Sequence, residues 1–299
     1  MQITINSRSG NSQKFPLTID IPADATVDQL KQAIYKKASK YYPDRQRLTV
    51  NQQVLNEGKT LKEFNIKDGD TISFKDLGPQ ISWRTVFCIE YFGPIVFHPI
   101  FYYFNSQIYG KEFEHSKMQT IAYYMIMAHF IKREIETLFV HRFSHGTMPF
   151  KNVFKNSFHY HALSGLNLAY WVYGPWNAAG SLDGKREDWL IWTCAGVFTW
   201  AQVSNLYTHI ILRNLRPPGT RVRRIPYGYG FNLVSCPNYF FETIVWLSVC
   251  ILTKSFAAWL FLAVGFTQMY LWAIKKHKSY RKEFKDYPKN RKAMIPFIA

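Results

Sequence analysis

The sequence predicts an α-helical membrane bundle of about six spans, within a range of five to seven, preceded by a small β-grasp domain. Uneven charge and hydrophobic patterning predict this fold class. The net charge of +17 divides into 12 Lys/Arg against 9 Asp/Glu in residues 1–77, and 25 against 11 in residues 78–299. The first part alternates in short segments, whereas the second contains long apolar runs rich in aromatic residues. We therefore expect two domains, residues 1–77 and residues 78–299.

Composition excludes several classes of protein. An apolar fraction of 47% excludes a disordered chain, and four cysteines without a Cys-x-x-Cys spacing exclude a disulfide scaffold and a zinc module. Residues 1–20 are polar and alternating, so we expect no secretory signal and a cytosolic amino terminus. A basic chain suggests a nucleic-acid partner. We expect none, since membrane spans would separate the basic segments.

The first domain has the pattern of a β-grasp. Alternating segments bounded by turn residues predict strands at residues 2–6, 15–21, 48–51 and 71–74. Thr26 is expected to cap a helix in which Val27, Leu30 and Ile34 recur at helical spacing. Residues 61–72, Leu-x-x-Phe-x-Ile-x-Asp-Gly-Asp-Thr-Ile, resemble ubiquitin-like folds. The chain continues past residue 78 without a free Gly-Gly end, so we expect a docking module or a solubilising cap, not a conjugated modifier.

The second domain is expected to cross the membrane. The candidate spans are Thr85–Phe104, Gln119–Leu138, Phe158–Trp176, Trp189–Leu212, Phe240–Leu252 and Phe256–Ile274. Several are shorter than the roughly 20 residues that a span needs. Alternate connections are basic, namely residues 140–157, 213–239 and 275–292, and the intervening ones are balanced or slightly acidic. The positive-inside rule then places both termini in the cytosol.

Polar residues inside these spans are candidates for chemistry, because burying them in a membrane is costly. Glu90 lies in the first span, and Gly93-Pro94 after it could kink the helix; Glu90 could equally be an interhelical hydrogen-bond partner. In the fourth span Asn205, His209 and Arg213 recur at i, i+4 and i+8. This stripe runs into Arg216 and into Arg221, Arg223 and Arg224, which suits a phosphate-bearing ligand. The alternative is that these arginines only determine topology.

Two more polar groups lie near the carboxyl end. Asn238 and Glu242 are one helical turn apart, and Tyr239 between them offers a phenol as a proton donor. In the basic tail His277, Tyr280, Phe284 and Tyr287 are expected to share a helical face. The alternative for the tail is a basic helix lying on anionic lipid.

These motifs, taken in order, resemble the steroid 5α-reductase superfamily. The carriers are Asn238-Tyr239-x-x-Glu242, His209-x-x-x-Arg213 and the ending His277-x-x-Tyr280…Tyr287-Pro288…Ile295-Pro296-Phe297. The chain is more closely similar to the very-long-chain trans-2-enoyl-CoA reductase family. The features shared with that family are a ubiquitin-like amino-terminal domain, Glu-Tyr-x-Gly-Pro at residues 90–94, Glu-Thr-Leu-Phe-Val-His-Arg-Phe-Ser at 136–144, and residues 146–149 and 234–239.

The resemblance implies a multi-span enzyme of the endoplasmic reticulum that uses NADPH to reduce the 2,3 double bond of an enoyl-CoA, the last step of each elongation cycle. It implies Glu90 and Tyr239 as the catalytic pair. The residues expected to bind NADPH are Asn205, His209, Arg213, Arg216, Asn238, Glu242, His277 and Tyr280. We assign His129 and Arg133 to the substrate. One departure is that relatives often have tyrosine after this histidine, where Phe130 stands here.

The expected chemistry follows from these assignments. No G-x-G-x-x-G fingerprint follows a strand, so the dinucleotide is expected among the helices, with its phosphates on cytosolic arginines. Hydride addition to C3 places negative charge on the thioester oxygen and at C2. Tyr239 is expected to protonate C2, with Glu90 donating a hydrogen bond or relaying the proton. The expected partners are a long-chain trans-2-enoyl-CoA, membrane lipid and the other elongation enzymes: condensing enzyme, 3-ketoacyl-CoA reductase and dehydratase.

Three alternatives remain. A 3-oxo-steroid or polyprenol reductase of the same superfamily would share the chemistry. A di-iron hydroxylase or desaturase could use His141, His145, His159 and His161, but no His-His pair occurs and we expect no metal. A non-enzymatic membrane adaptor could dock through residues 1–77.

Overall fold

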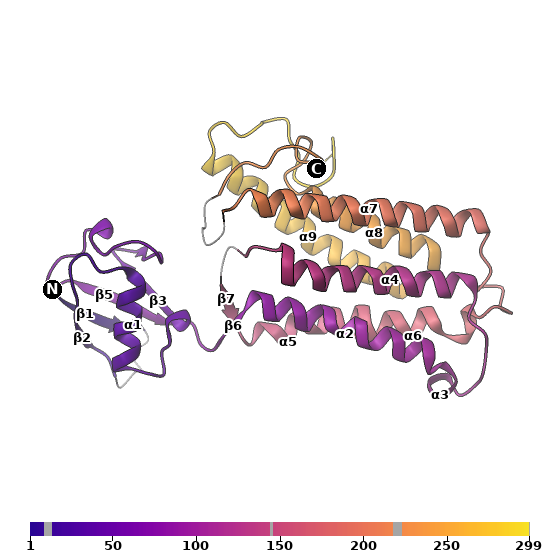
Figure 1. Cartoon of the computed structure of the whole chain (residues 1–299), viewed down its shortest axis with the longest axis horizontal. Coiled ribbons are helices and arrows are strands. Elements are labelled where there is room, and N and C mark those ends of the chain that lie inside the picture. The colour runs from indigo at the N-terminus through magenta and orange to yellow at the C-terminus, as the bar shows by residue number, and fades with distance from the viewer. Residues whose placement is uncertain (9–13, 144–145, 218–222, 299) are drawn as a thin grey trace. The chain divides into compact units, whose positions relative to one another are not determined.

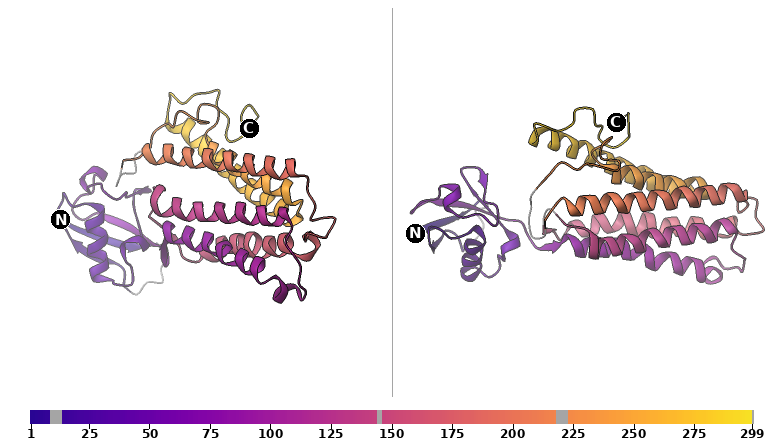
Figure 2. Two further views of the ribbon diagram at one scale, coloured as in Figure 1. Left: turned by 45° about the vertical axis from the view of Figure 1, so that its right-hand side comes forward. Right: turned by 45° about the horizontal axis from the view of Figure 1, so that its top comes forward.

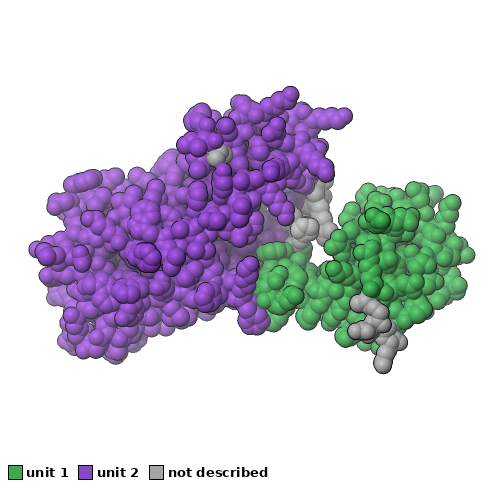
Figure 3. Space-filling model, turned by 180° about the vertical axis from the view of Figure 1, so that it is seen from behind, with its two compact units in different colours: residues 1–83, 145–153 green, residues 84–144, 154–299 purple. Residues whose placement is uncertain are grey.

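The structure is a computed structural model that describes residues 1–8, 14–143, 146–217 and 223–298. Ser144, His145 and Arg221 of the motifs above lie outside the described residues. The chain forms two compact units, Met1–Trp83 with His145–Val153, and Arg84–Ser144 with Phe154–Ala299, which Figure 3 distinguishes by colour. The division predicted between residues 77 and 78 stays a prediction.

The first unit contains the predicted ubiquitin-like β-grasp. Its sheet has the order β2-β1-β5-β3-β4, with β1 parallel to β5. The strands are β1 Gln2–Ser7, β2 Leu17–Asp20, β3 Gln46–Val50, β4 Gln53–Val54 and β5 Thr71–Asp76. The two-residue β4 was not predicted, because so short a segment has no alternation to detect.

Helix α1, Val27–Lys37, covers the hydrophobic core of this unit. Thr26 caps it as predicted: its side chain accepts from Gln29 N at 3.2 Å, and Gln29 Oε1 accepts from Thr26 N at 2.8 Å. Val27, Leu30 and Ile34 are fully buried. Short 3₁₀ turns lie at Pro43–Arg45 and Lys62–Phe64. The helix and its cap were therefore readable from local sequence, whereas these two turns were not predicted.

A tight ion pair precedes the exit of the chain from the sheet. Arg45 donates to Asp76 through Nε at 2.9 Å and Nη2 at 2.6 Å. Partial burial opposes ionisation of Asp76, but the hydrogen-bonded guanidinium prevails and lowers the pKa of this carboxyl. Strand β6, Gln80–Ser82, then pairs antiparallel with β7, Thr147–Pro149, within the same unit.

The second unit is a bundle of helices, and Figures 1 and 2 show its long helices side by side. Helix α8 packs against α7, α9 and α4. The α-helices are α2 Trp83–Tyr103, α3 Asn105–Tyr109, α4 Lys117–Ile135, α5 Asn152–Ser157, α6 Leu168–Tyr173, α7 Asp188–Asn214, α8 Pro237–Thr253 and α9 Phe256–Glu283. π-Helical segments follow α4 at Glu136–Val140 and α5 at Phe158–Asn167, and a 3₁₀ turn lies at Pro175–Asn177.

Two helices among the described residues, α2 and α9, are long and apolar enough to cross a membrane. Helical structure also occupies the other four predicted segments, but those helices do not combine the length and apolar composition of a span. The unit is therefore mostly helical with two candidate spans, and the prediction of six is not confirmed.

Helix α2 continues through Pro94 and Pro99 without breaking. Gly93 leaves the space that the ring of His161 occupies, because an added Cβ would lie 2.1 Å from that ring. His161 Nε2 lies 2.7 Å from the carbonyl oxygen of Ile89, and the ring of His159 stacks on Phe261 with centroids 4.8 Å apart. These two histidines, which suggested metal ligands, thus have packing partners.

Candidate active site

The site is built around Glu136, at the carboxyl end of α4. Glu136 is 1% exposed. Its carboxylate forms ion pairs with Lys132 Nζ at 3.0 Å and with Arg133 Nη1 at 2.7 Å. Residues three and four positions apart lie on one helical face, so these contacts follow from local spacing. The chain widens into a π-helical turn here, with His141 N donating to Glu136 O at 2.8 Å.

Helix α7 contributes two predicted residues to the same carboxylate environment. His209 Nδ1 lies 3.1 Å from Glu136 Oε1 and 3.4 Å from Arg133 Nη1. Lys132 Nζ donates to Asn205 Oδ1 at 2.7 Å. Asn205 and His209 are one turn apart and both buried, so these two members of the polar stripe predicted in the fourth span face α4.

Helix α8 closes the cluster. Asn205 Nδ2 donates to Glu242 Oε2 at 3.2 Å and to the Asn238 carbonyl at 2.9 Å. Gln202 Nε2 donates to His129 Nδ1 at 2.9 Å, so the proton of a neutral His129 lies on Nε2, which is 3.4 Å from Glu242 Oε1. We call these residues the Glu136 cluster: His129, Lys132, Arg133, Glu136, Gln202, Asn205, His209 and Glu242.

The formal charges of the cluster balance, since two carboxylates face one lysine and one arginine. Buried ions are tolerated only when paired in this way. Glu136, His141 and His209 also place their ligand atoms within 4.8 Å of one another, as a metal site would. Lys132 and Arg133 already contact the same carboxylate, and their positive charges oppose binding of a cation.

Glu90 and Tyr239, the predicted catalytic pair, do not belong to the Glu136 cluster. Glu90 is buried in α2, hydrogen-bonds with Asn156 and has one carboxylate oxygen without a described partner. Tyr239 lies in the first turn of α8 beside Asn238, half-buried, with its ring 6.4 Å from Trp272. No hydrogen bond joins Glu90 to Tyr239 within the described part of the chain.

The arginines at the end of α7 contact a segment that follows α4. Arg142 Nη1 donates to the Arg213 carbonyl at 3.0 Å and also to the Arg216 carbonyl, while Arg216 Nη1 donates to the Arg142 carbonyl at 2.9 Å. These reciprocal contacts hold the guanidinium groups of Arg142 and Arg216 at the end of α7, where Arg213 contributes its backbone carbonyl. The grouping is chemically suited to phosphate.

The tail forms a second polar cluster. Ser235 Oγ lies 2.6 Å from both His277 Nδ1 and Tyr287 OH, and the rings of Tyr280 and Tyr287 stack with centroids 5.4 Å apart. Arg223 lies over Tyr280 at 5.5 Å. The predicted helical face is wrong for Phe284 and Tyr287, because α9 ends at Glu283. The turn beyond it nevertheless returns Tyr287 to His277 and Tyr280.

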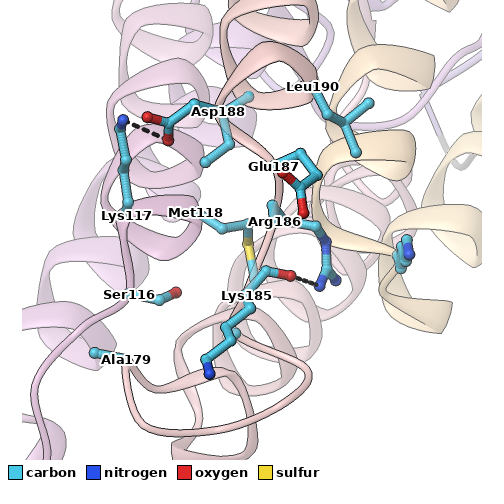
Figure 4. A pocket seen from close by; sticks show the side chains of 12 residues that line it. Ser116, Lys117, Met118, Ala179, Lys185, Arg186, Glu187, Asp188 and Leu190 are labelled. Atoms are coloured by element: carbon cyan, nitrogen blue, oxygen red, sulfur yellow. Dashed lines mark hydrogen bonds and ion pairs between the residues drawn. The ribbon is translucent and has the colours of Figure 1, made fainter.

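A cavity of about 570 Å³ lies apart from this site. It is lined by Lys117, Arg186 and Asp188, among others (Figure 4). Asp188 begins α7, 17 residues before Asn205, which at 1.5 Å per residue is about 26 Å away. Arg186 donates to the carbonyls of Leu252 and Thr253 at the end of α8, so its role there is explained by capping.

Four residues of the site were not predicted from the sequence. They are Lys132 and Glu136 of the ion-paired group, Gln202, which bonds His129, and Arg142. The spacing of residues 129, 132, 133 and 136 was a usable signal, because it places four polar side chains on one face of an apolar helix. Glu136 was used only as part of a family motif. The structure brings together six predicted residues: Asn205, His209, Asn238, Glu242, His129 and Arg133.

Comparison with known proteins places this geometry in context. Residues 146–299 match the family model for 3-oxo-5-alpha-steroid 4-dehydrogenase, and residues 3–74 match that of the ubiquitin family. A Schizosaccharomyces pombe protein whose name is that of an enoyl reductase is 49% identical over the whole of both chains. The very-long-chain enoyl-CoA reductase of Dictyostelium discoideum is 39% identical over 99% of both chains. A mouse trans-2,3-enoyl-CoA reductase-like protein is 31% identical over 92% of this chain and 78% of its own.

Proposed function

The chain belongs to the very-long-chain trans-2-enoyl-CoA reductase family of the steroid 5α-reductase superfamily, and from that premise we propose that it reduces the 2,3 double bond of long-chain trans-2-enoyl-CoA with NADPH. This reaction completes each cycle of fatty-acid elongation. The observation that carries the proposal is the Glu136 cluster, where predicted residues from α4, α7 and α8 meet in a buried, charge-balanced network.

The polar groups of this unit fit a dinucleotide. Asn205 and Glu242 place an amide and a carboxylate side by side, bonded to each other, and a nicotinamide carboxamide that replaces this bond would meet a complementary donor and acceptor. Arg142, Arg213 and Arg216 supply cationic donors for phosphates, and we assign NADPH because further cations, Arg223 and Lys276, accompany Tyr280 nearby. When bound, NADPH supplies the hydride.

The residues of the chain then orient the substrate and handle the proton. Tyr239 donates a proton to C2 of the substrate, and Glu90 hydrogen-bonds or relays that proton within an apolar environment. His129 and Arg133 contact the thioester end of the substrate. His277, Tyr280 and Asn238 hold the dinucleotide from the α8 and tail side.

We further propose that the helical unit lies in the endoplasmic-reticulum membrane with six spans and both termini cytosolic. Basic connections alternate along the sequence, and α2 and α9 are candidate spans. The acyl chain then lies among apolar helices, while the CoA head group stays at the cytosolic side. The condensing enzyme, the 3-ketoacyl-CoA reductase and the dehydratase of the cycle are its proposed partners.

The test is NADPH oxidation by the purified full chain in detergent, with a long-chain trans-2-enoyl-CoA, a steroid enone and a polyprenol as separate acceptors. Oxidation with the enoyl-CoA alone supports the proposal. Preference for the steroid or the polyprenol would assign the chain to the other reductases of the superfamily, and no oxidation with any acceptor would favour an adaptor.

The role of Tyr239 is tested separately by Tyr239→Phe. This variant should abolish turnover yet bind NADPH as the wild type does. Near-normal turnover would exclude Tyr239 as the proton donor.

A further inference from the structure

Tyr91, directly after Glu90 in α2, is tied to the Glu136 cluster by an arginine. Its hydroxyl oxygen lies 2.8 Å from Arg133 Nη2, and the guanidinium carbon lies 5.1 Å from the centre of its ring. Tyr91 is 2% exposed, so this contact forms away from bulk water. Arg133 is itself held by Glu136, which fixes the position of the phenol relative to the cluster.

The direction of this hydrogen bond leaves the phenol with unused capacity. A guanidinium only donates, so the Tyr91 oxygen must accept, and its own O–H hydrogen remains available. No described residue accepts that hydrogen. A buried donor without an acceptor is unfavourable unless a ligand satisfies it. Next to it in sequence, the buried Glu90 carboxylate also has an oxygen without a described partner.

Aromatic rings pack around the ring of Tyr91. The ring of Tyr91 lies 5.7 Å from Phe87, 5.2 Å from Tyr160 and 6.4 Å from Phe130, measured between centroids. Phe130 belongs to α4, so Tyr91 of α2 packs against the helix that also carries Arg133.

We propose that Tyr91 is a catalytic residue that donates a hydrogen bond to the thioester carbonyl oxygen of the enoyl-CoA, with Arg133 polarising its hydroxyl. This proposal rests on the proposed function. When hydride adds to C3, the π electrons of the C2=C3 bond form a new double bond between C1 and C2. The π electrons of the thioester carbonyl then move onto its oxygen, which gives an enolate. Tyr91 keeps its proton and stabilises that oxyanion by hydrogen bonding. The thioester carbonyl re-forms when the enolate takes the proton of Tyr239 at C2. The Tyr239 phenolate is then reprotonated from water.

The kinetic test is Tyr91→Phe in the full chain, which keeps the ring and removes the donor. Loss of one oxyanion donor should lower kcat by about 100-fold to 1000-fold, with the dissociation constant of NADPH unchanged. The matched control is Tyr123→Phe, a buried tyrosine on α4 that lies ten residues, or about 15 Å, before Arg133. Its kcat should stay close to that of the wild type.

A second readout separates catalysis from structure. The infrared band of a carbon-13-labelled thioester carbonyl should shift to lower wavenumber when trans-2-enoyl-CoA binds the wild type with NADP⁺. The shift should vanish in Tyr91→Phe and persist in Tyr123→Phe. An unchanged shift in Tyr91→Phe would overturn the role of Tyr91 while leaving the proposed function intact, whereas a wild type that oxidises no NADPH with enoyl-CoA would overturn the proposed function itself.

If Tyr91→Phe does not fold, 3-fluorotyrosine at position 91 keeps the ring and the contact with Arg133 and makes the hydroxyl a stronger donor. A larger carbonyl shift then supports the proposal. A shift equal to that of the wild type contradicts it.

Discussion

The helical unit buries polar side chains near both ends of α4, and the two groups differ in charge and in how completely their atoms are bonded. At the start of α4, Gln119 donates to the carbonyls of Val172 and Gly174 at 3.0 and 2.9 Å and accepts from Ser116 N at 3.0 Å. At the other end, 17 residues or about 26 Å away, Glu136 forms ion pairs with Lys132 and Arg133.

Neutral hydrogen bonds also join α2 to α6 and to the π-helical segment before it. His98 uses both ring nitrogens, at 2.7 Å from Tyr173 OH and 2.8 Å from the Ser164 carbonyl. We call His98, Gln119 and Tyr173 the Gln119 cluster. Every polar side-chain atom of the Gln119 cluster has a partner, although Ser164 Oγ beside it has none described. By contrast, the Glu136 cluster itself leaves Gln202 Oε1 without a described partner, as Glu90 in α2 leaves one oxygen. Saturated bonding stabilises a fold, whereas buried atoms with unused capacity are available to a ligand.

The largest effect is expected from Glu136→Gln. The change removes the carboxylate that Lys132 and Arg133 share, and leaving buried charges unpaired costs about 3–5 kcal/mol of unfolding free energy. Turnover should be lost at the same time, because Arg133 no longer holds Tyr91 in place. Thermal unfolding in detergent and NADPH oxidation measure the two effects.

Glu136→Asp is the control for this variant, since it keeps the charge and shortens its reach. It should retain most of the stability and lose part of the activity. Wild-type stability in Glu136→Gln would show that the cluster is not held by this carboxylate.

A smaller effect, confined to stability, is expected from His98→Leu. The substitution leaves the Tyr173 hydroxyl and the Ser164 carbonyl without their partner, at a cost of about 1–3 kcal/mol for a buried unsatisfied group. The melting temperature should fall, while kcat and KM of the protein that remains folded should stay unchanged. A selective loss of kcat at wild-type stability would contradict the structural role given to the Gln119 cluster.

Gln202→Leu should affect substrate binding more than stability, because Gln202 Oε1 already lacks a described partner. Removing that atom offsets the loss of the bond to His129 Nδ1, so stability should change by less than about 1 kcal/mol. His129, which we assign to the substrate, loses the partner that fixes its proton on Nε2, so KM for the enoyl-CoA should rise about tenfold, equal to about 1.4 kcal/mol. Dissociation constants for the enoyl-CoA from fluorescence titration provide the check; an unchanged constant together with a large loss of stability would assign Gln202 to the fold alone.

Local sequence predicted the parts of the structure that depend on local interactions. Thr26 and Gln29 form the expected capping box, and Asn205 and His209 share a face because helical spacing requires it. Spacing within one helix does not reveal which helix lies opposite. The contact of His209 with Glu136, 73 residues apart, depends on how α4 and α7 pack. The unused hydrogen of Tyr91 is equally invisible in the sequence, because it follows from the position of Arg133 alone.

The smallest effect is expected from Lys117→Met, beside the cavity near the start of α4. Lys117 Nζ lies 2.7 Å from Asp188 Oδ1, but these side chains are 47% and 72% exposed. Exposed ion pairs contribute about 0–1 kcal/mol, so the unfolding free energy should change by less than about 0.5 kcal/mol. Activity should match the wild type, and Asp188→Asn should behave alike. If either variant impairs NADPH oxidation, the cavity of Figure 4 contributes to function, and the contrast between the two ends of α4 no longer holds.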